Sequence, residues 1–361
     1  MTKKEVQKLK LVLEDGSVFE GESFGAYRET DGEVVFATAM VGYPESLTDP
    51  SYNGQILTFT SPLIGNYGVP KSTPKKDIEE FLESSRIWPR AIIVSEYSEA
   101  YSHWEADKSL GYWLKEHDVP GITGVDTRTL TKKIREHGVM LGKILFENTK
   151  ANNKFVDPNE DDLISQTSIE KPKHFASGKK HVALIDTGIK NNIIRSFLKR
   201  NISITLVPWD HDFSKDKTKY DGYFFSNGPG DPTSVPETVE AMKHAFTTGK
   251  PTYGICMGSQ IMAIAAGGKT YKMKYGHRSH NQPCTDLETG RCYITTQNHG
   301  FAVDAKSLPK DWKVWFENAN DKTVEGIKHK SKPFASVQFH PEATSGPTDT
   351  EFIFDQFVRL L

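Results

Sequence analysis

The chain of 361 residues contains few cysteines, and the three present are Cys256, Cys284 and Cys292. So small a number does not supply the disulfide framework of a secreted domain, so we expect a reducing compartment, specifically the cytoplasm. Long apolar runs are also missing, since no stretch approaches the roughly 20 residues of a membrane-spanning helix. No apolar segment follows the first residues, so a signal peptide is not expected.

The sequence also lacks an excess of charge of either sign. Lys and Arg number 45 against 47 Asp and Glu, so nothing predicts a nucleic-acid or membrane partner. A P-loop and a G-x-G-x-x-G turn, the glycine-rich patterns that bind nucleotide phosphates, are absent too. We therefore expect no cofactor in this chain. Its length suggests two domains.

The most informative segment that is present covers residues 251–268, where a short apolar run meets a helix-forming run. Between the two runs lies the pentapeptide Gly254-Ile255-Cys256-Met257-Gly258. This is the G-x-S-x-G pattern of a nucleophile elbow with Cys in place of Ser. Glycines on both sides let a strand turn sharply into a helix, and the helix N-terminus favours a thiolate at the corner. A buried structural Cys is the alternative, because free Cys is often found in protein cores.

Two further segments supply the chemistry that a Cys nucleophile needs. An alternating run ends in His340-Pro341-Glu342, which provides a base and a carboxylate to orient it. The alternative is a histidine at a strand end beside a solvated Glu. The loop 226–232 follows an apolar run and contains Gly228 and Gly230, whose bare backbone N–H groups suit an oxyanion hole. An ordinary turn is the alternative for this loop.

Together, and in this order, the three segments resemble the class I glutamine amidotransferase domain with its Cys-His-Glu triad. The resemblance implies that Cys256 is the nucleophile, His340 the base and Glu342 its orienting group. It assigns oxyanion contacts to the backbone of Met257 and of the loop containing Gly228 and Gly230. The remaining contacts to L-glutamine carry over onto Ser51, Gln260, Asn298, Gly300 and Phe301. The family often has Cys-Leu-Gly-His-Gln at the elbow, whereas this chain has Cys256-Met257-Gly258-Ser259-Gln260.

Strands alternate with helices from about residue 180 onward, which predicts an α/β domain with a mostly parallel sheet flanked by helices. The first 150 residues begin β-rich, with a hairpin turn at Asp15-Gly16. Residues 42–52 have the Pro, Gly and Asp content of a loop, and Asp126 or Thr127 is expected to cap a helix that Gly138 ends. A polar segment suggests a linker. The predicted division is an N-terminal domain 1–150, a linker 151–178 and a C-terminal domain 179–361.

The N-terminal part resembles the small, glutamine-hydrolysing chain of carbamoyl phosphate synthetase. The matching residues are Gly42-Tyr43, Leu47-Thr48-Asp49-Pro50-Ser51-Tyr52, Gly65-Asn66-Tyr67-Gly68 and Asp126-Thr127-Arg128. This resemblance implies a large partner chain that receives ammonia through a tunnel and makes carbamoyl phosphate from bicarbonate, with ATP and Mg held in that partner. It leaves open whether the product feeds arginine or pyrimidine synthesis. The rival interpretations are a glutaminase of another synthetase, a non-catalytic regulatory chain, and a free-standing γ-glutamyl hydrolase.

A His-rich segment, residues 276–282, suggests a metal site at first sight. His277 and His280 lie in it, and His299 lies in the segment assigned to glutamine binding. No carboxylate or thiol is found at the sequence spacing of a closed metal site. We therefore predict no metal in this chain.

Overall fold

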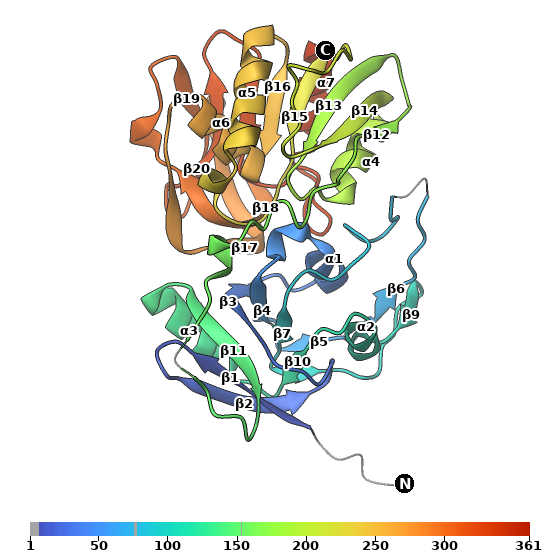
Figure 1. Ribbon diagram of the computed structural model, residues 1–361, viewed down its shortest axis with the longest axis vertical. Coiled ribbons are helices and arrows are strands. Elements are labelled where there is room, and N and C mark those ends of the chain that lie inside the picture. The colour runs from blue at the N-terminus through green and yellow to red at the C-terminus, as the bar shows by residue number, and fades with distance from the viewer. Residues whose placement is uncertain (1–6, 76–77, 153) are drawn as a thin grey trace. The chain divides into compact units, whose positions relative to one another are not determined.

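The structure, a computed structural model, describes residues 7–75, 78–152 and 154–361. It divides into two compact units, Met1–Asp161 and Asp162–Leu361 (Figure 1). No helix in the described part of the chain is long and apolar enough to cross a membrane.

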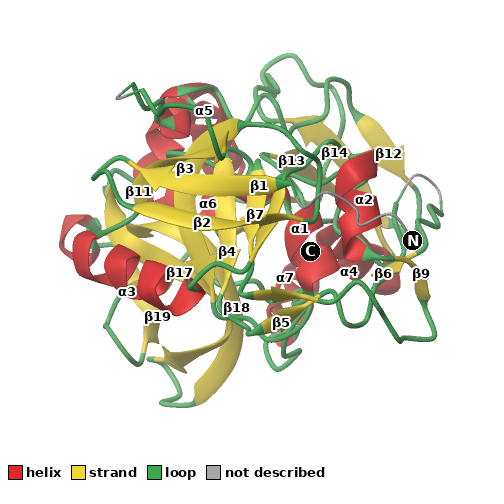
Figure 2. Cartoon of the chain, turned by 90° about the horizontal axis from the view of Figure 1, so that it is seen from below, coloured by secondary structure: helices red, strands yellow, loops and turns green. Residues whose placement is uncertain are grey.

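A closed barrel forms the first unit. Its strands follow the order β1-β11-β3-β4-β7-β10-β2, and Figure 2 shows several of them crossing one another. Their bounds are β1 Lys8–Leu13, β2 Val18–Ser23, β3 Thr30–Ala37, β4 Gln55–Phe59, β7 Ala91–Ile93, β10 Gly121–Thr123 and β11 Met140–Phe146. β1 and β2 pair antiparallel around Gly16, which has φ 84°. The predicted hairpin and β-rich start are confirmed.

Helices and short strands complete the first unit. They are α1 Tyr43–Thr48, η1 Pro50–Tyr52, β5 Leu63–Ile64, β6 Val69–Pro70, β8 Glu96–Tyr97, β9 Ala106–Lys108, α2 Leu110–Glu116, α3 Thr127–His137 and η2 Pro158–Glu160. Asp126 caps α3 by accepting from the Thr129 N–H at 2.9 Å, and Gly138 ends it, as expected. The loop predicted over 42–52 is wrong, because this segment forms α1 and η1. Burial of Leu47 and a proline in the first turn of each helix outweigh the turn-forming composition.

A ten-stranded sheet forms the centre of the second unit. Five neighbouring strands are parallel: β14 Ile202–Pro208, β13 Lys180–Asp186, β15 Gly222–Phe225, β16 Thr252–Ile255 and β21 Phe334–Val337. Antiparallel strands extend both edges: β12 Lys173–Phe175, β20 Val324–His329, β19 Trp312–Asn318, β17 Thr270–Asp286 and β18 Cys292–Val303. The predicted fold class is confirmed, and the parallel arrangement describes the centre of the sheet.

Helices cover both faces of this sheet, as the alternation of side chains on β15 shows. Phe224 packs on Phe197 of α4 Asn191–Lys199 and on Phe357 of α7 Phe352–Leu360. Its neighbour Phe225 points to the other face and joins the core formed with α5 Pro236–Thr248 and α6 Met257–Ala265. Successive residues of a strand point to opposite faces, so β15 is buried between two helical layers. Two short 3-10 helices, η3 Pro232–Ser234 and η4 Ala305–Ser307, complete the unit.

The segment predicted as a linker, residues 151–178, is shared between the two units. From Asp162 onward it belongs to the second unit. Leu163 and Ile164 are buried, and β12 pairs with β14. The structure therefore differs from the expected linker over residues 162–178. The prediction was based on the polar composition of these residues, but a few apolar side chains among them are buried in the second unit.

Candidate active site

Cys256 occupies the sharp corner between β16 and α6. Its backbone has φ 53° and ψ −103°, a conformation that non-glycine residues rarely adopt. The corner is held because the Cys256 N–H donates to Val337 O of the neighbouring strand at 2.9 Å. The thiol itself lies 3.5 Å from the carbonyl oxygen of Asn298. Strain of this kind persists only where the surrounding structure imposes it, and such positions cluster at functional sites.

The two glycines of the elbow are required by close backbone approach. A Cβ on Gly254 would lie 2.6 Å from the carbonyl carbon of Gly258, where the strand leaves for the helix. A Cβ on Gly258 would lie 2.4 Å from the carbonyl oxygen of Phe225 on the adjacent strand. Gly258 also donates its N–H to Ser226 O at 2.9 Å. Neither position therefore accepts a side chain without displacing backbone.

His340 and Glu342 form a buried pair just beyond the end of β21. The imidazole Nδ1 lies 2.6 Å from Glu342 Oε1, and each residue is 1% exposed. The His340 N–H donates to Thr296 O at 2.8 Å, which attaches this segment to β18. The other imidazole nitrogen, Nε2, is buried and has no partner at hydrogen-bond geometry among the described residues. The pair thus presents one imidazole nitrogen that Glu342 does not occupy.

Charge and burial compete at this pair. Burial lowers the pKa of His340, but the Glu342 carboxylate, the nearby Cys256 thiol and the hydrogen bond to Glu342 outweigh it and raise the pKa to about 10. Cys256 follows β16 and His340 follows the neighbouring parallel strand β21, so the thiol and the imidazole lie at the same end of two adjacent strands. Burial raises the pKa of Glu342, but the charges of Lys190 and His340 lower it to about 2. The imidazolium and the carboxylate are therefore the favoured forms near neutral pH.

Lys190 is a third charged group in this cluster, and the sequence analysis missed it. Its Nζ lies 3.1 Å from Glu342 Oε1 and donates to Ala343 O at 2.6 Å. The side chain is 4% exposed. Asn192, in the first turn of α4, donates to Glu342 O and to Thr344 Oγ1. Lys190 precedes α4 in a run with no catalytic pattern, so only the long-range fold brings it to Glu342.

The loop predicted to help form an oxyanion hole follows β15, next to the elbow strand. A Cβ on Gly228 would lie 1.9 Å from Thr187 O, and Gly230 has φ +84°. Both positions therefore need glycine. Met257 is the first residue of α6, and the N–H groups of a helix's first turn have no acceptor within the helix. The predicted oxyanion donors thus lie on the segments that follow two neighbouring parallel strands, β15 and β16.

The residues predicted to bind glutamine within the second unit gather on α6 and β18. Gln260 Nε2 donates to Phe301 O at 3.0 Å and to Gln338 Oε1 at 3.2 Å. Its Oε1 is buried without a hydrogen-bond partner among the described residues. Asn298 contacts the thiol through its carbonyl, and Gly300 follows two residues later, where a Cβ would approach Arg278 Nη2 to 3.3 Å. Gln260 therefore has an acceptor available on a residue one helical turn from the nucleophile.

Ser51 and Ser259 are two serines that the sequence analysis singled out. Ser51 lies in η1 of the first unit, where its N–H donates to Asp49 Oδ1 at 2.9 Å. Ser259, the departure from the usual elbow sequence, is buried and forms a 2.8 Å hydroxyl pair with Ser336. That contact ties α6 to β21, which leads to His340. Ser259 therefore helps to hold the helix of the elbow against the strand that precedes His340.

One metal-capable cluster is found in the described part of the chain. His277, His299 and Glu325 are buried, and their potential ligand atoms lie within 4.8 Å of one another. The sequence analysis considered the two histidines and found no carboxylate near them. Glu325 supplies that carboxylate from β20, a strand whose approach to β17 and β18 only the fold reveals.

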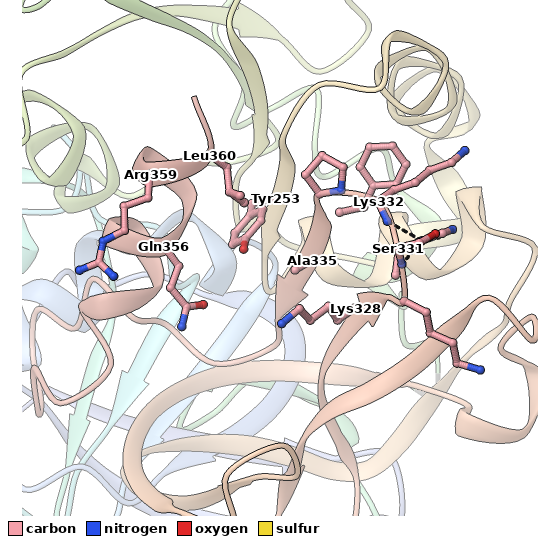
Figure 3. Close-up of a pocket in the computed structure, with 12 residues that line it drawn as sticks. Tyr253, Lys328, Ser331, Lys332, Ala335, Gln356, Arg359 and Leu360 are labelled. Atoms are coloured by element: carbon pink, nitrogen blue, oxygen red, sulfur yellow. Dashed lines mark hydrogen bonds between the residues drawn. The ribbon is translucent and has the colours of Figure 1, made fainter.

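A cavity of about 530 Å³ lies elsewhere in the second unit. It is bounded by α7 and by the starts of β16 and β21, and Figure 3 shows Tyr253, Gln356 and Lys328 around it. Ligands of open α/β sheets bind outside the carboxyl ends of the strands, where the Cys256 elbow lies. None of the predicted site residues lines this cavity. It is therefore not the candidate active site.

The fold and the site define a class I glutamine amidotransferase. The family model described as glutamine amidotransferase class-I matches residues 183–360, which include the elbow and the His340–Glu342 pair. A second model, described as carbamoyl-phosphate synthase small chain, CPSase domain, matches residues 11–144. The chain belongs to the carbamoyl phosphate synthase small-chain family, which confirms the predicted resemblance.

Similarity to curated relatives covers almost the whole chain. The chain is 48% identical over 353 residues to the carbamoyl phosphate synthase arginine-specific small chain of Neosartorya fischeri. The match covers 96% of this chain and 78% of that one. The chain is 51% identical to the multifunctional protein CAD of Squalus acanthias and 50% identical to the multifunctional protein ura1 of Schizosaccharomyces pombe. The matches cover 97% and 99% of this chain, but only 16% and 17% of those longer relatives.

Proposed function

We propose that this chain hydrolyses L-glutamine to glutamate and ammonia and supplies the ammonia for carbamoyl phosphate synthesis, as the small chain of a glutamine-hydrolysing synthase. One observation carries the proposal: a thiol on a strained corner lies beside a buried imidazole that is bonded to a carboxylate. Nucleophile, base and orienting group are the parts that covalent acyl transfer requires. A non-catalytic regulatory chain has no need to maintain this strained and charged arrangement.

In the first half of the reaction the Cys256 sulfur attacks the side-chain carbonyl carbon of glutamine. His340 Nε2, the nitrogen that faces away from Glu342, holds the thiol proton as an imidazolium, so the sulfur attacks as a thiolate. Backbone N–H groups of Met257 and of the loop containing Gly228 and Gly230 stabilise the oxyanion. The C–N bond then breaks, His340 returns the proton to the leaving nitrogen, and ammonia departs from a γ-glutamyl thioester.

In the second half, water replaces ammonia. His340 removes a proton from the water as its oxygen attacks the thioester carbon. The C–S bond breaks, glutamate leaves, and the thiolate and the imidazolium are restored. Glu342 keeps the imidazole oriented throughout and stabilises its charged form. Gln260 Oε1, a buried acceptor, bonds a donor group of the substrate.

The partner in this proposal is a large chain that uses the ammonia with bicarbonate. The support is the small-chain family itself and the lack of a P-loop or G-x-G-x-x-G turn in this sequence. ATP and Mg belong to the partner in this proposal, and the glutamine chemistry of this chain uses no cofactor. Ser51, from the first unit, is proposed to contact glutamine. The arginine-specific and multifunctional relatives leave both the arginine and the pyrimidine routes open.

The direct test is Cys256→Ser in the full chain, assayed with its large partner. A hydroxyl near neutral pH is a far poorer nucleophile than a thiol. We expect glutamine-dependent synthesis to fall by orders of magnitude while ammonia-dependent synthesis persists. Cys292→Ser, which changes an exposed thiol, serves as the control and is expected to keep both activities. Equal loss of both activities in the Cys256 variant would contradict the proposal.

A further inference from the structure

His277, His299 and Glu325 come from three different strands and meet inside the second unit. His277 of β17 and His299 of β18 are register partners, and Glu325 lies on β20. Glu325 Oε1 is 3.3 Å from His277 Nδ1 and 3.9 Å from His299 Nε2. Gln297 Oε1 lies 3.2 Å from the same His299 nitrogen. Two imidazoles, a carboxylate and an amide oxygen therefore converge on one small volume.

Groups outside this cluster fix which nitrogen of each imidazole faces inward. His277 Nε2 lies 2.8 Å from Asp321 Oδ2, so this nitrogen carries the hydrogen and donates. His299 Nδ1 lies 2.8 Å from Phe301 O and donates in the same way. In the neutral rings, His277 Nδ1 and His299 Nε2 then present lone pairs to Glu325. A carboxylate or a backbone carbonyl behind each imidazole is the usual outer support of metal-ligating histidines.

The inward-facing atoms are all acceptors, so they repel one another unless a positive charge lies between them. Glu325 Oε2 and His277 Nδ1 are buried without a hydrogen-bond partner in the described part of the chain. A proton on His277 Nδ1 would satisfy the contact with Glu325. His299 Nε2 would still face the amide oxygen of Gln297 with no hydrogen between the two acceptors. A buried polar group without a partner costs about 1–3 kcal/mol, so Glu325 Oε2 and His277 Nδ1 favour a shared cation.

We propose that His277, His299 and Glu325 bind a zinc ion, with Gln297 Oε1 as the fourth ligand. Zinc takes imidazole and carboxylate ligands at about 2.0–2.2 Å in a tetrahedral site, which places the ligand atoms about 3.4 Å apart. The contacts of 3.2, 3.3 and 3.9 Å are close to that spacing. All four ligand residues are buried, and zinc needs no open coordination position in a structural site.

The site would cross-link β17, β18 and β20, which the β17–β18, β17–β19 and β19–β20 pairings join within the sheet. Phe301 O, which accepts from His299, also accepts from Gln260 Nε2 at 3.0 Å. The ion thus supports the strand that borders the Cys256 elbow. This role is structural, and the inference does not depend on the proposed glutamine chemistry.

The test uses the full chain carrying Cys256→Ser, so that the reactive thiol does not bind the metal. Metal is removed with a chelator, zinc chloride is titrated back, and bound zinc is counted by elemental mass spectrometry after desalting. We expect one zinc ion per chain, with affinity reduced at least 100-fold by Glu325→Gln and by His277→Gln. His211→Gln is the matched control, because His211 pairs with Asp216 at 3.0 Å and has no third ligand. It should bind zinc like the parent.

Cobalt substitution gives a second measurement that needs no variant at the site. Co²⁺ in a four-coordinate site with imidazole ligands has strong visible absorption bands, whereas hydrated Co²⁺ absorbs weakly. We expect these bands at one equivalent of Co²⁺ and their loss on addition of zinc. Absence of the bands at saturating Co²⁺, or zinc binding unchanged in Glu325→Gln, would overturn the proposal.

Discussion

Lys190 and Glu342 form a buried ion pair, so the two charges are expected to depend on each other for stability. The two charges are 3.1 Å apart, with side-chain exposures of 4% and 0%. Removing one partner of a buried ion pair typically costs about 3–5 kcal/mol, because the remaining charge stays buried without its counter-ion. We therefore expect Glu342→Gln to destabilise the chain by about that amount, and Lys190→Met to cost less, because Glu342 keeps the His340 imidazolium as a counter-ion. For a unit of this size the loss in Glu342→Gln corresponds to a fall in Tm of roughly 6–20 °C.

The double variant separates coupling from simple damage. If the charges act on each other, Lys190→Met with Glu342→Gln removes both charges of the pair, and burial then favours the neutral form of His340. The loss of the double variant should therefore be well below the sum of the two single losses. Urea unfolding of the full chain, followed by fluorescence, measures all three free energies. Lys243→Met is the control, because its exposed pair with Glu240 at 2.7 Å should contribute under about 1 kcal/mol. Strict additivity of the two single losses would refute the reasoning.

Three further outcomes follow from the geometry. The pKa of Glu342 is lowered in the folded chain, so the stability that its carboxylate contributes is lost as pH falls from 4.5 toward 2. The pKa of His340 is raised, so the stability that its imidazolium contributes is lost as pH rises from 6.5 toward 10. Urea midpoints should therefore peak between pH 4.5 and 6.5, and a flat profile would contradict this. Gly258→Ala should cost at least about 1–3 kcal/mol, since its Cβ would lie 2.4 Å from Phe225 O; unchanged thermal unfolding would show that the elbow yields easily. Ser51→Ala should raise the KM for glutamine about fivefold, the worth of about 1 kcal/mol, and leave ammonia-dependent activity intact; an unchanged KM excludes Ser51 from glutamine binding.

The elbow was predictable because its constraints are local. Gly254, Cys256 and Gly258 lie within five consecutive residues, and the steric reason for each glycine involves the same strand, helix and neighbouring strand. His340 and Glu342 are also near in sequence, so their pairing is implied by their spacing. Asp126 and Gly138 mark the ends of α3 by capping chemistry that acts within one turn. Except for the contact of Gly258 with Phe225, both partners of the decisive interaction lie within a few residues of each other in the sequence.

The features that were missed depend on contacts between distant segments. Lys190 reaches Glu342 only because β13 and β21 belong to one parallel sheet and their ends lie at the same edge. Glu325 joins His277 and His299 because three antiparallel strands bring them together. The helix α1 forms against a buried core that overrides a turn-like composition. Patterns along the chain contain no information about these partners, so no spacing rule reveals them.

The charges around Glu342 also constrain what the site holds comfortably. Lys190 and protonated His340 carry two positive charges, and Glu342 carries one negative charge, all inside the protein. One positive charge therefore remains without a counter-ion in the buried cluster. A sulfur anion on Cys256 neutralises it, and so does the oxygen anion that forms when the sulfur attacks a carbonyl. The buried cluster is electrically neutral when the site also holds one negative charge. Inhibitors that add to Cys256 as tetrahedral anions should therefore bind more tightly than neutral analogues of the same shape.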